Sequence, residues 1–219
     1  KARKLARITY EEMLEMASTG TKILQTRAVA LAMKFGQRLQ VLSSYSDEPG
    51  TLVVDEDEIV EQELVSGIAY SRDEAKITLV QVMDKPGVAA AIFGPLANAN
   101  INVDMIVQNV SADGTNTDLT FTVTENELER AVKTLEDSRE AVGYSELLFD
   151  SNVVKVSVIG VGMRSHTGVA QRMFTTLAEK GINIQVISTS EIKVSVLVAE
   201  EYTELALRAL HTAYGLDIE

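Results

Sequence analysis

Apolar residues near the start of the chain recur at helical spacing in two places. Residues 9–18 predict a helix whose first turn carries Thr9 and Glu12 at the spacing of a capping box. Residues 22–35 predict a second helix, which Gly36 is expected to end. The apolar face of the second helix is expected to hold Ile23, Val29, Ala30 and Met33.

The next stretch changes from helical spacing to short apolar runs. Residues 38–45 predict a strand, and residues 46–54 predict a turn that leads into another strand. The run DEDEIVEQE at 55–63 is strongly acidic. Such a run is most simply a solvated linker.

From residue 64 onward, β-branched segments with partial period-two alternation are separated by helical segments. The resulting order is strand–helix–strand–strand–helix–strand, preceded by one additional strand, and this order is typical of a ferredoxin-like unit. The strands are expected at 64–70, 76–83, 101–110, 117–124 and 145–149, and the helices at 88–99 and 125–138.

The same order then returns in the last third of the chain. Strands are expected at 153–162, 182–189 and 193–199, and helices at 166–181 and 201–214. A shift of 81 positions places identical residues on one another. The pairs are Gly87/Gly168, Val88/Val169, Ala89/Ala170, Phe93/Phe174, Leu96/Leu177, Ala97/Ala178, Ile101/Ile182 and Asn102/Asn183. Eight identities within 16 residues indicate an internal duplication.

The second unit has no clear closing strand, since only GLDIE follows its last helix. The additional strand at 64–70 is available to complete its sheet, because an unfilled sheet edge is a liability. We therefore predict an α+β fold with two ferredoxin-like (βαββαβ) units in tandem, the first inserted into the second, after a short helical segment. The expected domains are 1–63, 64–75 (completing the second unit), 76–150 and 151–219.

Composition narrows the possible partners. The 20 basic and 32 acidic side chains give a net charge of −12, which argues against a nucleic-acid surface. A net negative charge is suited to binding cationic or zwitterionic small molecules, or it simply keeps the chain in solution. The chain has no cysteine, which favours a reducing, cytoplasmic compartment, and it has no apolar run long enough for a membrane span. Because residue 1 is Lys, we expect a fragment or a processed product.

The turn at Asp84–Gly87 is the first candidate for chemistry. Asp84 has a common use as a helix cap, with Pro86 in the first turn. Alternatively, a free amino acid could place its carboxylate on the backbone N–H groups of Val88 and Ala89 and its ammonium on Asp84. Gly87 would let that backbone approach a ligand closely. The residues alone leave both interpretations open.

Other polar residues surround these turns. Gln108 could hydrogen-bond a molecule above the first turn, and Glu191 could supply a carboxylate to the second. The second turn has Ser165 where the first has Asp84, and Gln185 where the first unit has Asp104. Two sites, if both exist, should therefore prefer different ligands.

Simpler roles are also open for several of these residues. Asn102 and Asn183 could be turn formers. Adjacent Ser165 and His166 could suggest nucleophilic catalysis, but neighbouring side chains on a turn usually point apart. We therefore expect His166 and Thr167 to be turn and cap residues. No phosphate-binding loop of the P-loop type is present, and G-x-G at 160–162 lacks the third glycine of a dinucleotide fingerprint.

Two long motifs carry a resemblance to a known family. They are DKPGVAAAIFGPLANANINVDMIVQNVS, with TDLTFTV after it, and KVSVIGVGMRSHTGVAQRMFTTLAEKGINIQVISTSEIKVSVLV. They resemble the tandem ACT domains of aspartate kinase, and residues 12–53 resemble the end of that family's kinase domain and its linker. The resemblance covers nearly the whole chain. It implies that the two ferredoxin-like units are ACT domains of a regulatory region or regulatory subunit.

The resemblance also implies a function. The family phosphorylates aspartate with MgATP, the first step of lysine, threonine, methionine and isoleucine biosynthesis, and its ACT domains bind lysine, threonine or both as feedback inhibitors. This chain lacks the nucleotide and aspartate sites, so catalytic residues, metal ligands and cofactors are not expected in it. The implied partners are the amino-acid effectors, a second copy of the chain in a homodimer, and a catalytic aspartate kinase subunit.

The resemblance further implies two effector sites between ACT domains of two chains. The threonine-like site would use Asp84, Gly87, Val88, Ala89 and Gln108, with Asn183 and Ile184. The lysine-like site would use Met163, His166, Thr167, Gly168, Val169, Ser190 and Glu191, with Asn102, Val103 and Asp104 opposite. Lysine is assigned to the second site because its side-chain ammonium needs an acid there. Two alternatives stay open: an ACT dimerisation scaffold without effector binding, and one part of a complete aspartate kinase whose front half lies outside this sequence.

Overall fold

A computed structural model describes residues 3–59, 64–112 and 114–217 of the chain. Its backbone forms two compact units, one of residues 1–71 together with 155–219, and the other of residues 72–154. The unit of residues 72–154 is one continuous segment, and in the sequence it lies between the two parts of the other unit. Each unit contains its own four-stranded sheet.

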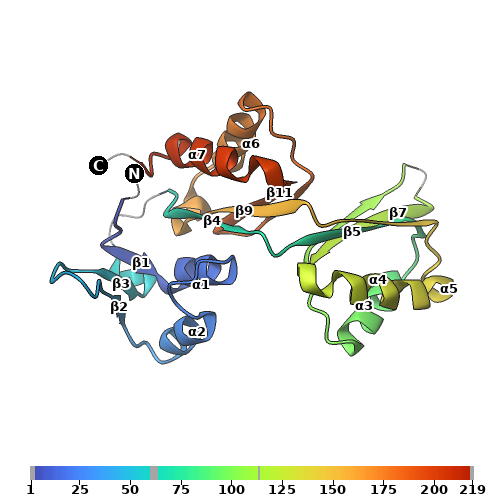
Figure 1. Ribbon diagram of the computed structural model, residues 1–219, viewed down its shortest axis with the longest axis horizontal. Coiled ribbons are helices and arrows are strands. Elements are labelled where there is room, and N and C mark those ends of the chain that lie inside the picture. The colour runs from blue at the N-terminus through green and yellow to red at the C-terminus, as the bar shows by residue number, and fades with distance from the viewer. Residues whose placement is uncertain (1–2, 60–63, 113, 218–219) are drawn as a thin grey trace. The chain divides into compact units, whose positions relative to one another are not determined.

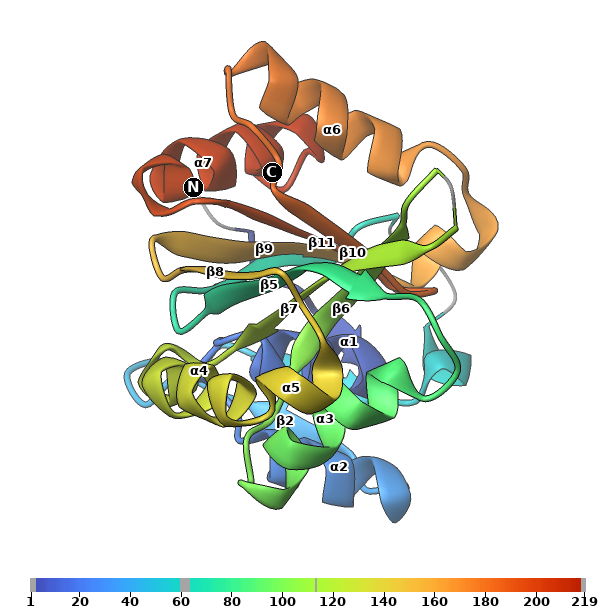
Figure 2. The ribbon, with the colours of Figure 1, turned by 90° about the vertical axis from the view of Figure 1, so that its right-hand side faces the viewer.

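The unit of residues 72–154 is a ferredoxin-like sandwich. Its sheet has the order β6-β7-β5-β8, and α3, α4 and α5 lie on one face of it (Figures 1 and 2). The elements are β5 (Ala75–Met83), α3 (Val88–Asn98), β6 (Asp104–Val110), β7 (Asn116–Val123), α4 (Leu128–Asp137), α5 (Arg139–Val142) and β8 (Glu146–Asp150). Alternate residues of β5 are buried under the helices, since Ala75, Ile77 and Leu79 are each 0% exposed. This period of two is what a sheet with one covered face requires.

The other unit repeats this arrangement. Its sheet has the order β10-β11-β9-β4, with α6 and α7 on one face and α1 (Tyr10–Ser18) on the other side (Figures 1 and 2). The elements are β4 (Gly67–Ser71), β9 (Val153–Ile159), α6 (Val169–Glu179), β10 (Val186–Thr189), β11 (Lys193–Ala199) and α7 (Thr203–Ala213). Every residue of β9 is buried, which fits a central strand covered on both faces.

The strand predicted to complete the second ferredoxin-like unit does so. β4 pairs with β9 in antiparallel register, with Ala69 opposite Ser157. The continuous unit is thus inserted between β4 and the rest of the sheet that β4 completes, as the sequence predicts. The insertion follows from edge filling, because without β4 the strand β9 would present unpaired backbone groups.

Residues before β4 form a small layer of their own. β1 (Arg7–Thr9), β3 (Thr51–Val54) and β2 (Leu39–Val41) make a three-stranded sheet in the order β1-β3-β2, accompanied by α1 (Tyr10–Ser18) and α2 (Thr26–Lys34). The predicted capping box is confirmed: the Thr9 hydroxyl accepts from the Glu12 N–H, and the Glu12 carboxylate accepts from the Thr9 N–H, both at 3.1 Å.

The predicted limits of some early elements are wrong. α2 begins at Thr26 rather than at residue 22, so Ile23 lies outside the helix and is 67% exposed. Met33 is 41% exposed as well, and the buried residues of α2 are Val29 and Ala32. The strand predicted over 38–45 covers only Leu39–Val41. Apolar spacing located these elements, but their ends depend on packing partners that are distant in sequence.

The duplication is visible in the backbone. α3 and α6 each have 11 residues, and each begins directly after a glycine in the left-handed region, Gly87 or Gly168. The buried positions also correspond, since Leu96 and Leu177 are both 1% exposed or less. The shift of 81 positions therefore relates structurally equivalent residues. None of the helices within the described ranges combines the length and hydropathy needed to cross a lipid bilayer.

Candidate functional site

The loop from β5 to α3, called the first loop, and the loop from β9 to α6, called the second loop, each end at a glycine in the left-handed region. Gly87 has φ 92° and ψ −4°, and Gly168 has φ 97° and ψ −5°. A Cβ built on either glycine would meet no atom within 4 Å, so the backbone conformation, not lack of space, is what favours glycine. The same glycine turn is therefore present in both copies, although their polar side chains differ.

These loops leave the helix starts without side-chain caps. No side chain caps α3 at Gly87 or α6 at Gly168. The interpretations of Asp84 and Thr167 as helix caps are therefore wrong. The N–H of Asp84 instead donates to the carbonyl of Thr115 at 3.0 Å, which fixes the loop against the β6–β7 turn. The N–H of Val88 donates to the Lys85 carbonyl at 3.2 Å. The other first-turn N–H groups, at the positive end of a helix dipole, are suited to a carboxylate.

The residues predicted for the first site within this unit lie on the first loop, at the start of α3 and on β6. Val88 is 5% exposed and anchors the helix start in the core, whereas Ala89 is exposed. Gln108 on β6 lies opposite Leu119, a buried residue of the core that α3 covers. Directly opposed residues of paired strands point to the same face of a sheet. Gln108 therefore points to the face of the sheet on which α3 begins, and it is exposed there.

The entrance to β6 is distorted at Asp104. One Asp104 carboxylate oxygen accepts from the N–H of Met105 at 2.8 Å, and Met105 is buried with φ +47°. A positive φ is rare for a bulky residue, and such strain is often found at functional sites. Asn102 is exposed and Val103 packs against the core, so the polar side chains of this segment are those of Asn102 and Asp104. Nothing in the sequence distinguished Met105.

The second loop has a different polar lining. It passes through a 3₁₀ helix, η3 (Val161–Ser165), before Gly168. Nδ1 of His166 lies 3.0 Å from the Gly162 carbonyl and 3.1 Å from the Ser165 hydroxyl, so the expectation that the Ser165 and His166 side chains point apart is wrong. A proton on Nδ1 satisfies the Gly162 carbonyl and leaves Nε2 as an acceptor for a donor outside the loop.

Ser190 and Glu191 form the turn between β10 and β11. The N–H of Ser190 donates to the carbonyl of Lys193 at 2.8 Å, which closes that turn. The Glu191 side chain is 83% exposed, and its carboxylate lies 3.5 Å from Nε of Arg164 in η3. The structure thus brings the predicted Glu191 turn and the predicted Met163–Gly168 loop together through Arg164, a residue that the sequence did not single out.

Tyr214 is a second residue that the sequence did not single out. Its hydroxyl donates to the carbonyl of Val169, in the first turn of α6, at 2.7 Å. Burial raises the pKa of this phenol to about 12, an effect that nearby Arg172 opposes. Tyr214 therefore fixes the second loop from the end of α7. A tyrosine at a helix end gives no sequence signal for such a contact.

The predicted sites are brought together in part. Within its own unit, the Met163–Val169 loop meets Glu191 through Arg164. In the other unit, Asp84–Ala89 lie in the loop and first turn of α3, and Gln108 lies on β6. Asn183 and Ile184 lie in the loop before β10, where Asn183 is exposed. The groupings that join Asn183 and Ile184 to the first loop, and Asn102–Asp104 to the second, connect different units. They stay predictions.

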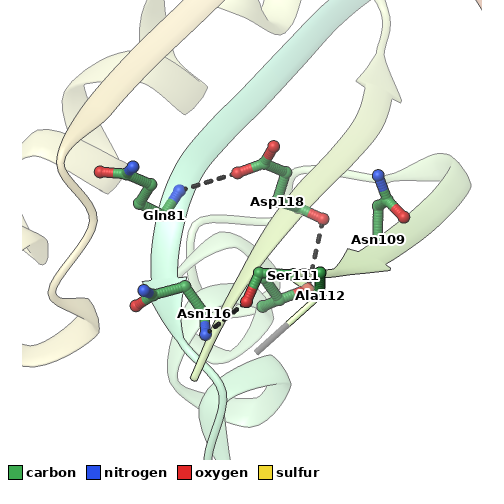
Figure 3. A pocket seen from close by; sticks show the side chains of 7 residues that line it. Gln81, Asn109, Ser111, Ala112, Asn116 and Asp118 are labelled. Carbon is green, nitrogen blue, oxygen red and sulfur yellow. Dashed lines mark hydrogen bonds between the residues drawn. The ribbon is translucent and has the colours of Figure 1, made fainter. Parts of the chain in front are cut away.

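A pocket of about 470 Å³ opens beside the β6–β7 turn, near the first loop (Figure 3). Polar side chains dominate the described residues that line it: Gln81, Asn109, Ser111, Ala112, Asn116, Thr117 and Asp118. Several of these groups bond one another, since the Gln81 N–H donates to Asp118 at 2.8 Å and the Asn116 N–H to Ser111 at 3.0 Å. The residues predicted for effector binding do not line this pocket.

The two ferredoxin-like units, with their matching helix-start loops, form a duplicated α+β architecture. The family model described as ACT domain matches residues 68–138 and 156–214, more than half of the chain. The chain therefore belongs to the ACT domain family. The first matched segment begins in β4 and contains the loop that ends at Gly87, and the second begins in β9 and contains the loop that ends at Gly168.

Its relatives within this family are aspartate kinases. The chain is 58% identical over 217 residues to aspartate kinase of Pseudomonas fluorescens (strain SBW25), a match that covers 99% of this chain and 52% of that protein. The chain thus spans about half the length of the curated relatives it matches.

Solved structures agree with these relatives. A crystal structure of aspartokinase alpha and beta subunits is 52% identical, with a TM-score of 0.65, over 69% of this chain and 99% of that one. The ligand-free regulatory subunit of aspartate kinase from Thermus thermophilus is 39% identical, with the same TM-score and coverage. The resemblance to the regulatory region of aspartate kinase is confirmed.

Proposed function

We propose that this chain is the amino-acid-sensing part of an aspartate kinase, and that lysine, threonine or both bind at its two helix-start loops to inhibit the first step of aspartate-family amino-acid biosynthesis. The observation that carries the proposal is the pair of equivalent turns at Gly87 and Gly168. Each turn offers an uncapped helix start for a carboxylate, and each has an acidic side chain on the loop or beside it.

The first loop suits threonine. The effector carboxylate would bind the N–H groups at the start of α3, its ammonium would face exposed Asp84, and its hydroxyl would bond Gln108. Gly87 keeps the approach open because no side chain stands in front of these N–H groups. A neutral side chain is favoured here because Gln108 carries no charge.

The second loop suits lysine. The start of α6 would bind the effector carboxylate, and Nε2 of His166 and the Ser190 hydroxyl would bond its polar groups. Glu191, 83% exposed, would take the side-chain ammonium, with Asp104 completing the site in the assembled dimer. An exposed carboxylate can pair with an incoming cation without first losing a buried partner.

The remaining partners follow from the same proposal. A homodimer formed through the ACT domains would complete each site, and a catalytic region that binds MgATP would receive the signal. Phosphoryl transfer needs metal and phosphate ligands in a positioned set, and we assign this chemistry to that catalytic region. The proposed compartment is the cytoplasm, where amino-acid biosynthesis takes place.

Isothermal titration calorimetry of the chain with lysine and with threonine tests the proposal. We expect Asp84→Ala to abolish threonine binding and spare lysine binding, and Glu191→Ala to do the opposite. Loss of the same ligand in both variants would contradict the assignment. Melting curves provide a second measurement, because a ligand that binds only the folded state raises the melting temperature.

Two other functions would be distinguished by the same samples. A dimerisation scaffold without effector binding would show an unchanged melting temperature with both amino acids and an intact dimer in light scattering. A chain that is itself catalytically complete would transfer phosphate from ATP to aspartate in a direct assay. We expect no such transfer from this chain alone.

A further inference from the structure

Arg164 holds three carboxylates from three separate parts of its unit. Its guanidinium lies 2.5 Å from Glu11 on α1, 2.5 Å from Glu56 in the acidic run, and 3.5 Å from Glu191. Glu56 is thus paired rather than merely solvated, so the linker interpretation of the acidic run is wrong for this residue, and residues 60–63 of the run lie outside the described residues. Arg164 is two residues before His166, so it connects the second loop directly to the layer that precedes the ACT domains.

The three contacts are unequal. Glu11 and Glu56 are 37% and 32% exposed and lie at hydrogen-bonding distance, whereas Glu191 is 83% exposed and lies 1 Å further away. Partial burial lowers the pKa of the Arg164 guanidinium, but Glu11 and Glu56 raise it by more, so the pKa lies above its ordinary value. Glu191 is therefore the partner that Arg164 gives up most readily.

The α1 helix is attached to the second loop region by neighbouring carboxylates as well. Glu12 accepts from the N–H of Val161, the first residue of η3, at 2.9 Å, and Glu15 pairs with Lys193 at 2.7 Å. A change in the ion pairs of Arg164 will consequently act on a helix that is already fixed to η3 and to β11. Glu15 offers a matched control, because it lies on the same helix but does not contact Arg164.

We propose that Arg164 couples effector binding at Glu191 to α1. A cationic effector takes the Glu191 carboxylate, and the guanidinium then pairs only with Glu11 and Glu56, which holds α1 more firmly against η3. This inference rests on the proposed function, and it identifies how the second effector site communicates with the residues that precede the ACT domains. Because coupling is reciprocal, changes at Glu11 and Glu56 must alter effector affinity.

Calorimetry with lysine on single and combined variants provides the test. We expect Arg164→Gln to free Glu191 and lower the Kd for lysine about twofold to fivefold, the range of exposed ion pairs. The double variant Glu11→Gln/Glu56→Gln should raise the Kd by a similar factor, because Arg164 then binds Glu191 more tightly. Glu15→Gln should leave the Kd unchanged.

Combining the changes separates this coupling from long-range electrostatics. In the Arg164→Gln background, adding Glu11→Gln/Glu56→Gln should have no further effect on the Kd, whereas unspecific charge effects would add. Hydrogen exchange gives an independent measurement. Lysine should slow the exchange of the α1 amides in the parent chain but not in Arg164→Gln.

Each outcome has a definite consequence. The coupling would be overturned if the changes in binding free energy were additive, or if lysine slowed hydrogen exchange of the α1 amides in Arg164→Gln. Lysine binding would still be established. If the parent chain does not bind lysine, the coupling falls together with the lysine part of the proposed function. Non-additive changes with the expected signs would support both.

Discussion

The buried carboxylate of Glu12 accepts a 2.9 Å hydrogen bond from the backbone N–H of Val161, a residue 149 positions later in the chain. The same carboxylate accepts from the Ser66 hydroxyl and from the N–H and hydroxyl of Thr9. One side chain therefore caps α1 and also attaches it to the second ferredoxin-like unit. Glu12 is only 2% exposed, so its carboxylate is shielded from solvent.

Replacing Glu12 should destabilise the chain strongly. We expect Glu12→Ala to lower the free energy of unfolding by about 2–4 kcal/mol, because several buried donors lose their charged acceptor. Glu15→Ala serves as the control, since its ion pair is partly exposed and should cost less than about 1 kcal/mol. Urea unfolding followed by circular dichroism measures both. Equal losses in the two variants would contradict the role of Glu12.

The glycines at the two helix starts should respond to substitution through backbone conformation alone. Gly87→Ala and Gly168→Ala should each cost about 1–2 kcal/mol of stability, because an L-residue is disfavoured at positive φ although space for a Cβ exists. Gly94→Ala, inside α3 and equally uncrowded, should instead stabilise the chain by about 0.5–1 kcal/mol. Thermal melts distinguish these signs, and a stabilising Gly87→Ala would refute the argument.

The strand β4 should matter to one sheet and not to the other. Ala69→Asp places a charge at a position that is 2% exposed, and it should speed hydrogen exchange in β9, β10 and β11 but not in β5–β8. Tyr70→Asp is the matched control on the next residue, which is 41% exposed, and it should have little effect. Faster exchange confined to β5–β8 would contradict the observed topology.

Tyr214 should make stability depend on pH at alkaline values. Its pKa of about 12 lies above the value near 10 of an unfolded tyrosine, so the folded state holds the proton more tightly. The corresponding stabilisation is complete below about pH 10 and decreases as the pH rises towards about 12. We expect Tyr214→Phe to lose less stability over this interval than the parent chain. Urea titrations at several pH values test this, and parallel curves would count against it.

Much of the fold could be predicted from local patterns. The spacing of Thr9 and Glu12 predicted a capping box, and the shift of 81 positions predicted equivalent helices, because both signals involve residues close together in sequence. The predicted ends of α2 and β2 were wrong, since those ends depend on which apolar residues find packing partners.

The polar contacts of the loops were harder to predict. Asp84 and Thr167 look like caps by type and position, but the left-handed glycine that follows each of them starts the helix without a side-chain bond. The Ser165–His166 contact depends on the 3₁₀ turn of η3, which shapes the backbone so that both side chains meet the Gly162 carbonyl. Such turns have no period that a sequence pattern could reveal.

By itself, the sequence determined the duplicated ferredoxin-like order, the insertion of one unit into the other and the two glycine turns, because periodicity and repetition are properties of neighbouring residues. Only the tertiary structure decided that Arg164 would be shared by Glu11, Glu56 and Glu191, and that Glu12 would bind Val161. Those groups lie up to 153 positions apart along the chain. A charge pairs with whichever opposite charge the fold brings within a few ångströms, and no local pattern encodes that distance.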